Sequence, residues 1–365
     1  MKVTADRFLL IKSWGCGFWS DVDHVMGQLL AAELTNRIPV VHWGSNSLYS
    51  ESFKGNAFEL YFEPVSNFAI EDLARPGYTY YPPIWNENNL LVEDLDKIAW
   101  AYRNLGDMMQ SNANVVVSDT HYFVRPLIPY IPKSHWAYGM TAHQIYRCLF
   151  DKYIRLKPDI QQEIQEFYDE FMKDSKPLLG VHIRGGDKVK EVENLSHLNK
   201  KYHQTIQDFV QRYDIKKILL LTDCEEHLID FQKRYGKMLI YTDAKRGQIS
   251  DTRNAPHLTS YSEKRRKGIE IIKDTYLASM CDFFIGNGYS NVSYTVKRLR
   301  DWPENNVVLF YRDLKHEMRL AKKRVKADRK RRKDESIRHR IEYPELYGGV
   351  NTYADEPVSV DKIIG

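Results

Sequence analysis

Short apolar runs alternate with helical patterns along most of the chain, and this alternation constrains the fold more than any other feature. A strand pattern at 7–11 precedes a helical pattern at about 20–35, and further strands are expected at 38–43 and 115–117. From residue 178 onward the pattern repeats, with strands expected at 178–183, 217–222, 238–242, 282–285 and 307–310 and helices at 200–213, 225–235 and 264–280. Strands joined through helices form parallel sheets, so the sequence predicts doubly wound α/β architecture.

The length of 365 residues favours two domains. We expect an N-terminal α/β domain over 1–172, a Rossmann-like domain over 173–312 and a basic tail over 313–365. A helix at 157–172 is the predicted bridge. The Pro- and Tyr-rich stretch 75–89 is expected to be a loop, and 94–109 is expected to be helical.

Charge is concentrated near the C-terminus. Residues 315–340 hold 13 Lys/Arg and 4 Asp/Glu, a balance of +9 against +4 for the whole chain, so the remainder is mildly acidic. This distribution argues against a nucleic-acid-binding body. The segment itself is read as a solvated tail, as a peripheral contact to an anionic membrane, or, least favoured, as a nucleic-acid contact.

Neither a membrane span nor a disulfide framework is indicated. No apolar run approaches 18 residues, and the start of the chain lacks a signal-peptide core. The four cysteines lack zinc-ligand or CxxC spacing, as is typical of free thiols in a reducing compartment. We therefore expect a cytoplasmic protein.

Ligands of open α/β sheets bind beyond the carboxyl ends of the strands, so the residues there are the first candidates. At the end of the strand 178–183, alternation places the side chains of His182 and Arg184 on the same face. An arginine at this position suits the binding of phosphate oxygens. The alternative is that Arg184 forms a structural salt bridge with Asp187. Ser290 and Asn291 follow the strand 282–285 and either bind phosphate or only cap a helix.

Other familiar patterns are weak or absent. Gly15, Cys16 and Gly17 begin like a dinucleotide fingerprint, but Ser20 stands where the third glycine belongs. The pair Asp21 and Asp23 has metal-binding spacing but falls at a helix start, where Asp is expected as a cap. Neither Walker, GxSxG nor HExxH motifs occur.

Residues 180–189 resemble the first motif of the α1,6-fucosyltransferase superfamily, which includes core N-glycan and nodulation fucosyltransferases. Its relatives act in α1,2 and protein O-fucosylation. Further ordered matches cover roughly residues 7–312 and comprise the glycine loop 15–18, the interdomain segment 152–160, the strand end 221–223 and the last motif, 274–283 with 289–292. The resemblance implies a two-domain glycosyltransferase-B-like fold.

That resemblance implies an inverting, metal-independent transfer of fucose from GDP-fucose to a glycan or glycolipid acceptor. In the family, the His and Asp that match His182 and Asp274 hold the guanine, although by spacing alone Asp274 reads as a solvated helix charge. The motif arginine, here Arg184, contacts the diphosphate. The segment 290–291 and the glycine loop 15–17 do so as well.

Two departures from the family pattern leave alternatives open. Family members place the catalytic base a few residues past the first motif, where this chain has Val192 between Glu191 and Glu193; these two acids are the candidates, with Asp187 in reserve.

The second departure lies within the first motif. Gly185 replaces a second arginine, so Lys188 or another loop takes part in donor binding, or the donor is a different nucleotide sugar. The remaining alternative is a non-catalytic nucleotide- or sugar-binding protein.

Acceptor contacts are expected from the first domain. The aromatic residues of the loop 75–89, Tyr81 and Trp85 among them, offer rings that stack on sugars, while Asp119 and His121 follow the strand 115–117. The alternative for the aromatic residues is that they fill the core of a surface loop.

Overall fold

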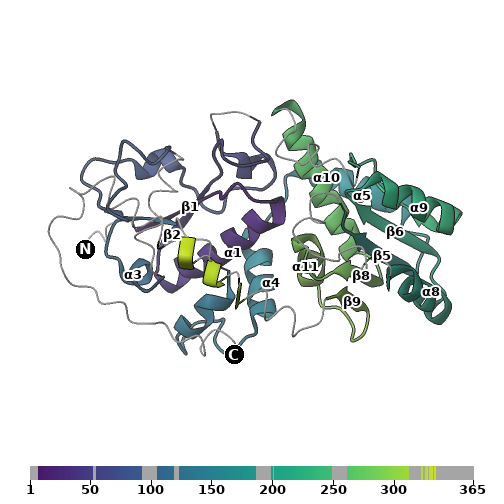
Figure 1. Cartoon of the computed structure of the whole chain (residues 1–365). Coiled ribbons are helices and arrows are strands. Elements are labelled where there is room, and N and C mark those ends of the chain that lie inside the picture. Colours follow the sequence, from purple (N-terminus) through teal and green to yellow (C-terminus); the bar gives the residue numbers. More distant parts are fainter. Residues whose placement is uncertain are drawn as a thin grey trace. The chain divides into compact units, whose positions relative to one another are not determined.

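The computed structural model describes residues 7–51, 55–92, 105–118, 123–185, 199, 201–248, 261–311, 322–323, 325–327, 329–331 and 333. Two parallel sheets, both within one compact unit of the chain, form its framework (Figure 1). No helix in this described part is both long and apolar enough to cross a bilayer.

The first sheet has the strand order β2-β1-β4-β3, and all its pairs are parallel. Its strands are β1 (Phe8–Lys12), β2 (Ile38–His42), β3 (Tyr80–Tyr81) and β4 (Val115–Ser118). Each side chain of β1 is buried, as expected for a central parallel strand covered on both faces. The helix α1 (Phe18–Leu34) joins β1 to β2, which confirms the predicted strand–helix–strand order.

The strand β3 corrects the expectation that 75–89 is entirely loop. Thr79 donates its N–H to Asn114 Oδ1 at 3.0 Å, and its carbonyl accepts the N–H of Val115 at 3.0 Å. These contacts bring Tyr80 and Tyr81 into register with β4. The pairing is set by a distant segment, so local sequence gave no sign of it.

The second sheet has the strand order β7-β6-β5-β8-β9, again all parallel. Its strands are β5 (Leu178–Ile183), β6 (Lys217–Thr222), β7 (Leu239–Ile240), β8 (Phe283–Asn287) and β9 (Val307–Phe310). From β5 the chain winds outward through β6 and β7, then returns to β8 on the other side. The order therefore reverses between β5 and β8, the kind of position where open α/β sheets bind ligands.

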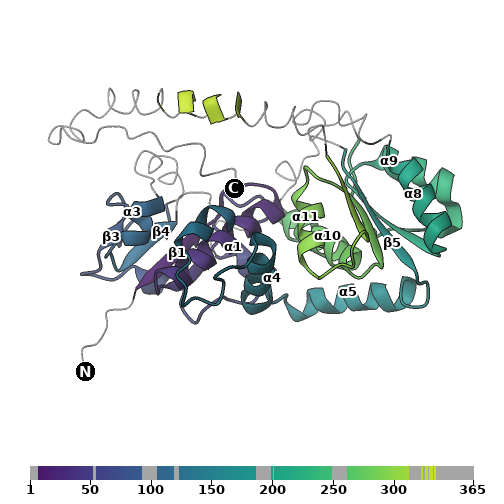
Figure 2. The same cartoon turned by 90° about the horizontal axis from the view of Figure 1, so that it is seen from below.

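Helices cover both faces of this sheet, as Figure 2 shows. The helices α8 (Lys201–Tyr213) and α9 (Glu225–Tyr235) lie on one face, and α10 (Tyr261–Ser279) and α11 (Asn291–Arg298) lie on the other. The side chains of β5 alternate accordingly: Leu179, Val181 and Ile183 pack with α8 and α9 in one apolar cluster. The side chain of His182 lies on the opposite face, where it contacts Ser293 of α11.

The remaining helices are α3 (Leu105–Gln110), α4 (Ala142–Tyr153) and α5 (Pro158–Phe171), with short 3-10 helices at Ala57–Leu60, Ile70–Leu73, Arg125–Tyr130 and Gly236–Met238. The predicted bridge helix corresponds to α5. Sequence reasoning missed α4, although Thr141 and Gln144 form a capping box at its start. Of the helix expected at 94–109, residues 94–104 lie outside the described residues.

Buried contacts join the two sheets into one body. Arg298 of α11 pairs with the buried Asp23 of α1 at 2.6 Å, and its guanidinium lies 4.3 Å from the ring centroid of Tyr146 on α4. On α10, a Cβ placed at Gly268 would lie 2.5 Å from the ring of Tyr61, so the helix packs closely there. One continuous apolar cluster includes side chains from both sheets.

Candidate donor site

Arg184, immediately after β5, is held by a carboxylate from the neighbouring strand. Its Nη1 lies 2.8 Å from Oδ2 of Asp223, which follows β6, and Oδ1 of the same carboxylate accepts the N–H of Gly185 at 2.9 Å. The two-point contact fixes both the guanidinium and the backbone of the turn. Asp223 is therefore a partner of Arg184, and the acid expected from the sequence, Asp187, lies outside the described residues.

The environment of Gly185 explains why a second arginine does not stand there. A Cβ at this position would lie 2.9 Å from Cβ of Cys224, 3.3 Å from its Sγ and 3.3 Å from Cδ2 of His227. The start of α9 therefore fills the volume that a side chain would need. The glycine fits this packing.

His182 is buried beneath the same edge, with 4% of its surface exposed. Its Nδ1 lies 2.7 Å from Oγ of Ser293, and that hydroxyl already accepts the N–H of Asn287 at 3.0 Å. A hydroxyl oxygen can accept a second hydrogen bond, so Ser293 either donates to Nδ1 or accepts from it, according to the tautomer of the ring. Burial lowers the pKa of His182 to about 3, so the ring is neutral.

The environment of Asp274 differs from the solvated helix position that its spacing alone indicates. It is partly buried on α10, and its Oδ1 accepts a hydrogen bond from Oγ1 of Thr242 at 2.6 Å. Burial raises its pKa to about 6, while the Thr242 hydroxyl and the cation of Arg246 act in the opposite direction. The carboxylate is thus a positioned acceptor just beyond β7.

Ser290 and Asn291 begin α11 directly after β8. Ser290 occupies the N-cap position but accepts no capping hydrogen bond with its side chain. The first N–H groups of a helix have no partner within the helix, and the helix dipole favours an anion there. Plain side-chain capping, the alternative for Ser290, is therefore not what the structure has.

The glycine loop before α1 has a fixed shape. Gly15 has a φ of +69°, and a Cβ there would lie 2.8 Å from the carbonyl oxygen of Asn46. Ser13 and Asn46 are joined by two hydrogen bonds, of 2.5 and 2.9 Å. No Cβ contact within 4 Å restricts Gly17. Residue 15 must therefore be glycine, which the sequence alone did not establish.

Asp21 does not cap α1, in contrast to the sequence expectation. The N-cap is Gly17, and the fully buried Asp21 carboxylate instead accepts the N–H groups of Trp14 and Cys16 at 3.3 and 3.4 Å. Burial raises its pKa to about 7, and burial together with this carboxylate raises the pKa of the Cys16 thiol to about 11. The amide of Cys16 in the glycine loop and that of the preceding Trp14 thus face inward, toward the protein's own carboxylate.

A buried hydrogen bond places the start of α1 against α10. The indole N–H of Trp19 donates to Oγ1 of Thr275 at 2.8 Å, and Thr275 is the neighbour of Asp274. The start of α1 therefore packs against the turn of α10 that carries Asp274. Residues more than 250 positions apart in sequence meet at this point.

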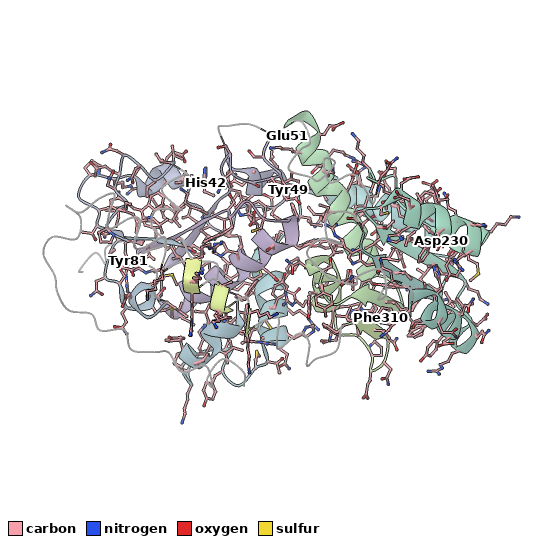
Figure 3. The ribbon with its side chains drawn as sticks, viewed as in Figure 1. His42, Tyr49, Glu51, Tyr81, Asp230 and Phe310 are labelled. Atoms are coloured by element: carbon pink, nitrogen blue, oxygen red, sulfur yellow. The ribbon has the colours of Figure 1, made fainter. Side chains whose placement is uncertain are left out.

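Among the expected acceptor residues, Trp85 is in a different environment from the one proposed. It is 2% exposed and packs in an apolar cluster with side chains of the first sheet, and Nζ of Lys12 lies 4.5 Å from its ring centroid. Its ring therefore fills the core, the alternative reading, and does not face a sugar. Tyr81, labelled in Figure 3, is half-buried in β3.

Several candidates cannot be placed. The possible bases Asp187, Glu191 and Glu193, the cation Lys188 and the acceptor residues Asp119 and His121 lie outside the described residues. Their roles remain predictions. Within the described ranges, no three His, Cys, Asp or Glu side chains gather closely enough to hold a metal ion.

Sequence reasoning missed the partners that orient the site: Asp223, Ser293, Thr242 and Arg246. Asp223 had a usable signal, because it directly follows a predicted strand whose carboxyl end borders that of β5. The other three are brought to the site by tertiary packing, and no spacing rule marks them.

Comparison with known proteins finds one matching family model. A family model described as the N- and catalytic domains of α-(1,6)-fucosyltransferase matches residues 143–298. No curated protein matches the chain in sequence.

Solved structures share its fold. The NodZ α-1,6-fucosyltransferase soaked with GDP-fucose is 19% identical, with a TM-score of 0.56 over 85% of this chain and 96% of that one. Fucosyltransferase NodZ from Bradyrhizobium is 19% identical, with a TM-score of 0.53 over 80% of this chain and 93% of that one. An Arabidopsis thaliana FUT1 mutant in complex with GDP is 12% identical, with a TM-score of 0.52 over 84% of this chain and 71% of that one. At such identities the likeness concerns the fold.

Proposed function

We propose that this chain is a glycosyltransferase of the fucosyltransferase superfamily and transfers fucose from GDP-fucose to a glycan or glycolipid acceptor. The matched family region supports the family resemblance, and the shared fold agrees with the expected architecture. The observation that carries the proposal for the donor is the edge of the second sheet, where Arg184, His182 and Asp274 are each held by a dedicated partner.

Asp274 and His182 are assigned to bind the guanine base of the donor. An ionised carboxylate accepts the N1–H and N2–H donors of guanine, which uracil and adenine do not present in that pattern. In the proposed complex the neutral His182 ring takes the tautomer with its proton on Nε2 and donates it to an acceptor of the same nucleoside. Because Thr242 and Ser293 fix these side chains, little ordering is required when the donor binds.

The diphosphate is assigned to Arg184, Lys188, Ser290–Asn291 and the glycine loop. Cleavage of the sugar C1–oxygen bond leaves negative charge on GDP. A guanidinium already fixed by Asp223 and the N–H groups at the start of α11 stabilise that charge without reorganising. In this proposal no metal ion is required.

The acceptor hydroxyl attacks C1 from the face opposite the diphosphate, which inverts the configuration. A carboxylate must take the hydroxyl proton, and we assign it to Glu191 or Glu193, with Asp187 as the third candidate. Single substitutions to Gln, or to Asn for Asp187, separate these three: the base variant loses transfer while it retains GDP binding.

The test is GDP release from GDP-fucose in the presence of a chelator, with an oligosaccharide mixture as acceptor. We expect Arg184→Gln to lower kcat by about 100- to 1,000-fold, the usual effect of removing one donor to a developing negative charge. Arg212→Gln, a change on the surface of α8, is the control and keeps full activity. Consumption of GDP-mannose or a UDP-sugar in place of GDP-fucose would contradict the donor assignment, and an intact donor would indicate a binding protein.

The basic segment is assigned to peripheral contact with the anionic cytoplasmic face of a membrane. Its described residues are helical and exposed. They include the cations Lys322, Lys323, Lys326, Arg329, Lys330, Arg331 and Lys333. Four of them recur at spacings of four, three and four residues and so share one face of a helix. No aromatic residue accompanies them in the described part, so bases find no stacking platform there.

Each cation near an anionic surface contributes about 1 kcal/mol. We therefore expect the full chain to sediment with phosphatidylserine vesicles and a chain truncated before residue 315 to stay in solution. Equal sedimentation of the two proteins would contradict the membrane assignment, and so would a preference of the full chain for RNA over vesicles.

A further inference from the structure

Arg246 lies in the loop after β7, and this loop spans the two halves of the donor site. Next to it, Gly247 donates its N–H to the carbonyl of Asp223 at 3.0 Å, and the carbonyl of Gly247 accepts the N–H of Glu225 at 2.9 Å. Thr242, four residues before Arg246, donates a hydrogen bond to the carboxylate of Asp274. The loop is therefore fixed at both ends by groups that orient the site.

The guanidinium of Arg246 is held by its own loop. Nη1 donates to the carbonyl of Ala244 at 2.7 Å and Nη2 to that of Thr242 at 3.0 Å, while the ring of Tyr241 lies 5.6 Å away. These contacts use two of the five N–H donors of the guanidinium. The buried Nε has no hydrogen-bond partner. Donors therefore remain for a ligand.

Arg246 and Asp274 form a donor–acceptor pair without neutralising one another. The cation acts electrostatically on the Asp274 carboxylate, yet the hydrogen bonds of the two side chains go to other groups. A direct ion pair would consume both groups. Both side chains are instead held at Thr242, Asp274 by its hydroxyl and Arg246 by its carbonyl, which keeps a carboxylate and a cation at the same residue.

We propose that Arg246 recognises guanine by donating to N7 and O6 while Asp274 accepts N1–H and N2–H. This inference rests on the proposed GDP-sugar donor and deepens it. Arginine on O6 and N7 is the most common specific contact of proteins to guanine. Adenine places an amino donor where guanine has O6, so the pair discriminates between the two purines.

The test compares GDP with 7-deaza-GDP, which lacks only the N7 acceptor, by calorimetry on the wild-type chain and Arg246→Met. We expect the wild type to bind 7-deaza-GDP on the order of tenfold more weakly than GDP. Arg246→Met should bind GDP more weakly by a similar factor and no longer distinguish the two nucleotides. Arg234→Met, a change on the exposed face of α9, should behave like wild type.

The outcomes separate this inference from the proposed function. If Arg246 only holds its loop, Arg246→Met weakens both nucleotides equally and keeps the penalty for 7-deaza-GDP, which overturns the inference. A wild type that binds GDP and 7-deaza-GDP equally overturns it too, while the donor assignment stands. A wild type that binds no GDP contradicts the proposed function itself. Arg246→Lys, which keeps the charge but loses the planar fork, provides a second variant should Arg246→Met fail to fold.

Discussion

The hydrogen bond from Trp19 of α1 to Thr275 of α10 is expected to make a measurable contribution to the free energy of unfolding. Both side chains are buried, with 2% and 0% exposed, and the indole N–H lies 2.8 Å from the hydroxyl oxygen. The hydroxyl proton goes to the carbonyl of Ile271 at 2.6 Å, so the oxygen acts as the acceptor for Trp19. Thr275→Val keeps the shape and removes the acceptor, which leaves a buried N–H unpaired.

An unsatisfied buried donor costs about 1–3 kcal/mol, and we expect Thr275→Val to lower the free energy of unfolding by that amount. The assay is urea denaturation followed by tryptophan fluorescence. Thr275→Ser, which keeps the hydroxyl, is the matched control and should lose less than half as much. A Val variant with the wild-type midpoint would refute the reasoning, because the N–H would then have found another partner.

Three further predictions concern the site. Gly15→Ala should lower the unfolding free energy by at least about 1–2 kcal/mol, since residue 15 is left-handed, whereas Gly17→Ala should cost less in the same denaturation assay, because its φ is −63° and only its N-cap position disfavours alanine. GDP affinity should fall as the pH drops through about 6, where the Asp274 carboxylate becomes protonated; calorimetry across this range checks it, and a flat profile argues against that acceptor. Gly185→Arg restores a motif arginine but collides with Cys224, so its melting temperature and its affinity for GDP should both fall, and tighter binding would contradict the packing argument.

The fold was predictable because continuous apolar runs are required for parallel strands buried on both faces. Leu178–Ile183 and Lys217–Thr222 coincide with β5 and β6, and the glycine loop and α1 follow β1 as expected. The short strand β3 was not predictable, since its pairing depends on Thr79 and Asn114, which lie 35 positions apart.

For the site, position relative to strand ends was enough to select Arg184, His182 and Ser290. The surroundings of each side chain could not be predicted from position in the sequence in the same way. Asp274 looks like a solvated helix charge until Thr242 is placed beside it, and Trp85 looks like a sugar platform until the core closes over its ring. Such partners come from tertiary packing, which local spacing does not encode.

Calorimetric titration with GDP, UDP and ADP in the presence of chelator, beside Arg184→Gln and Asp274→Asn, tests the central claim most directly. The account predicts selective binding of GDP that both substitutions weaken. Preference for UDP or ADP, or binding of GDP that neither substitution changes, would contradict the site described at the edge of the second sheet.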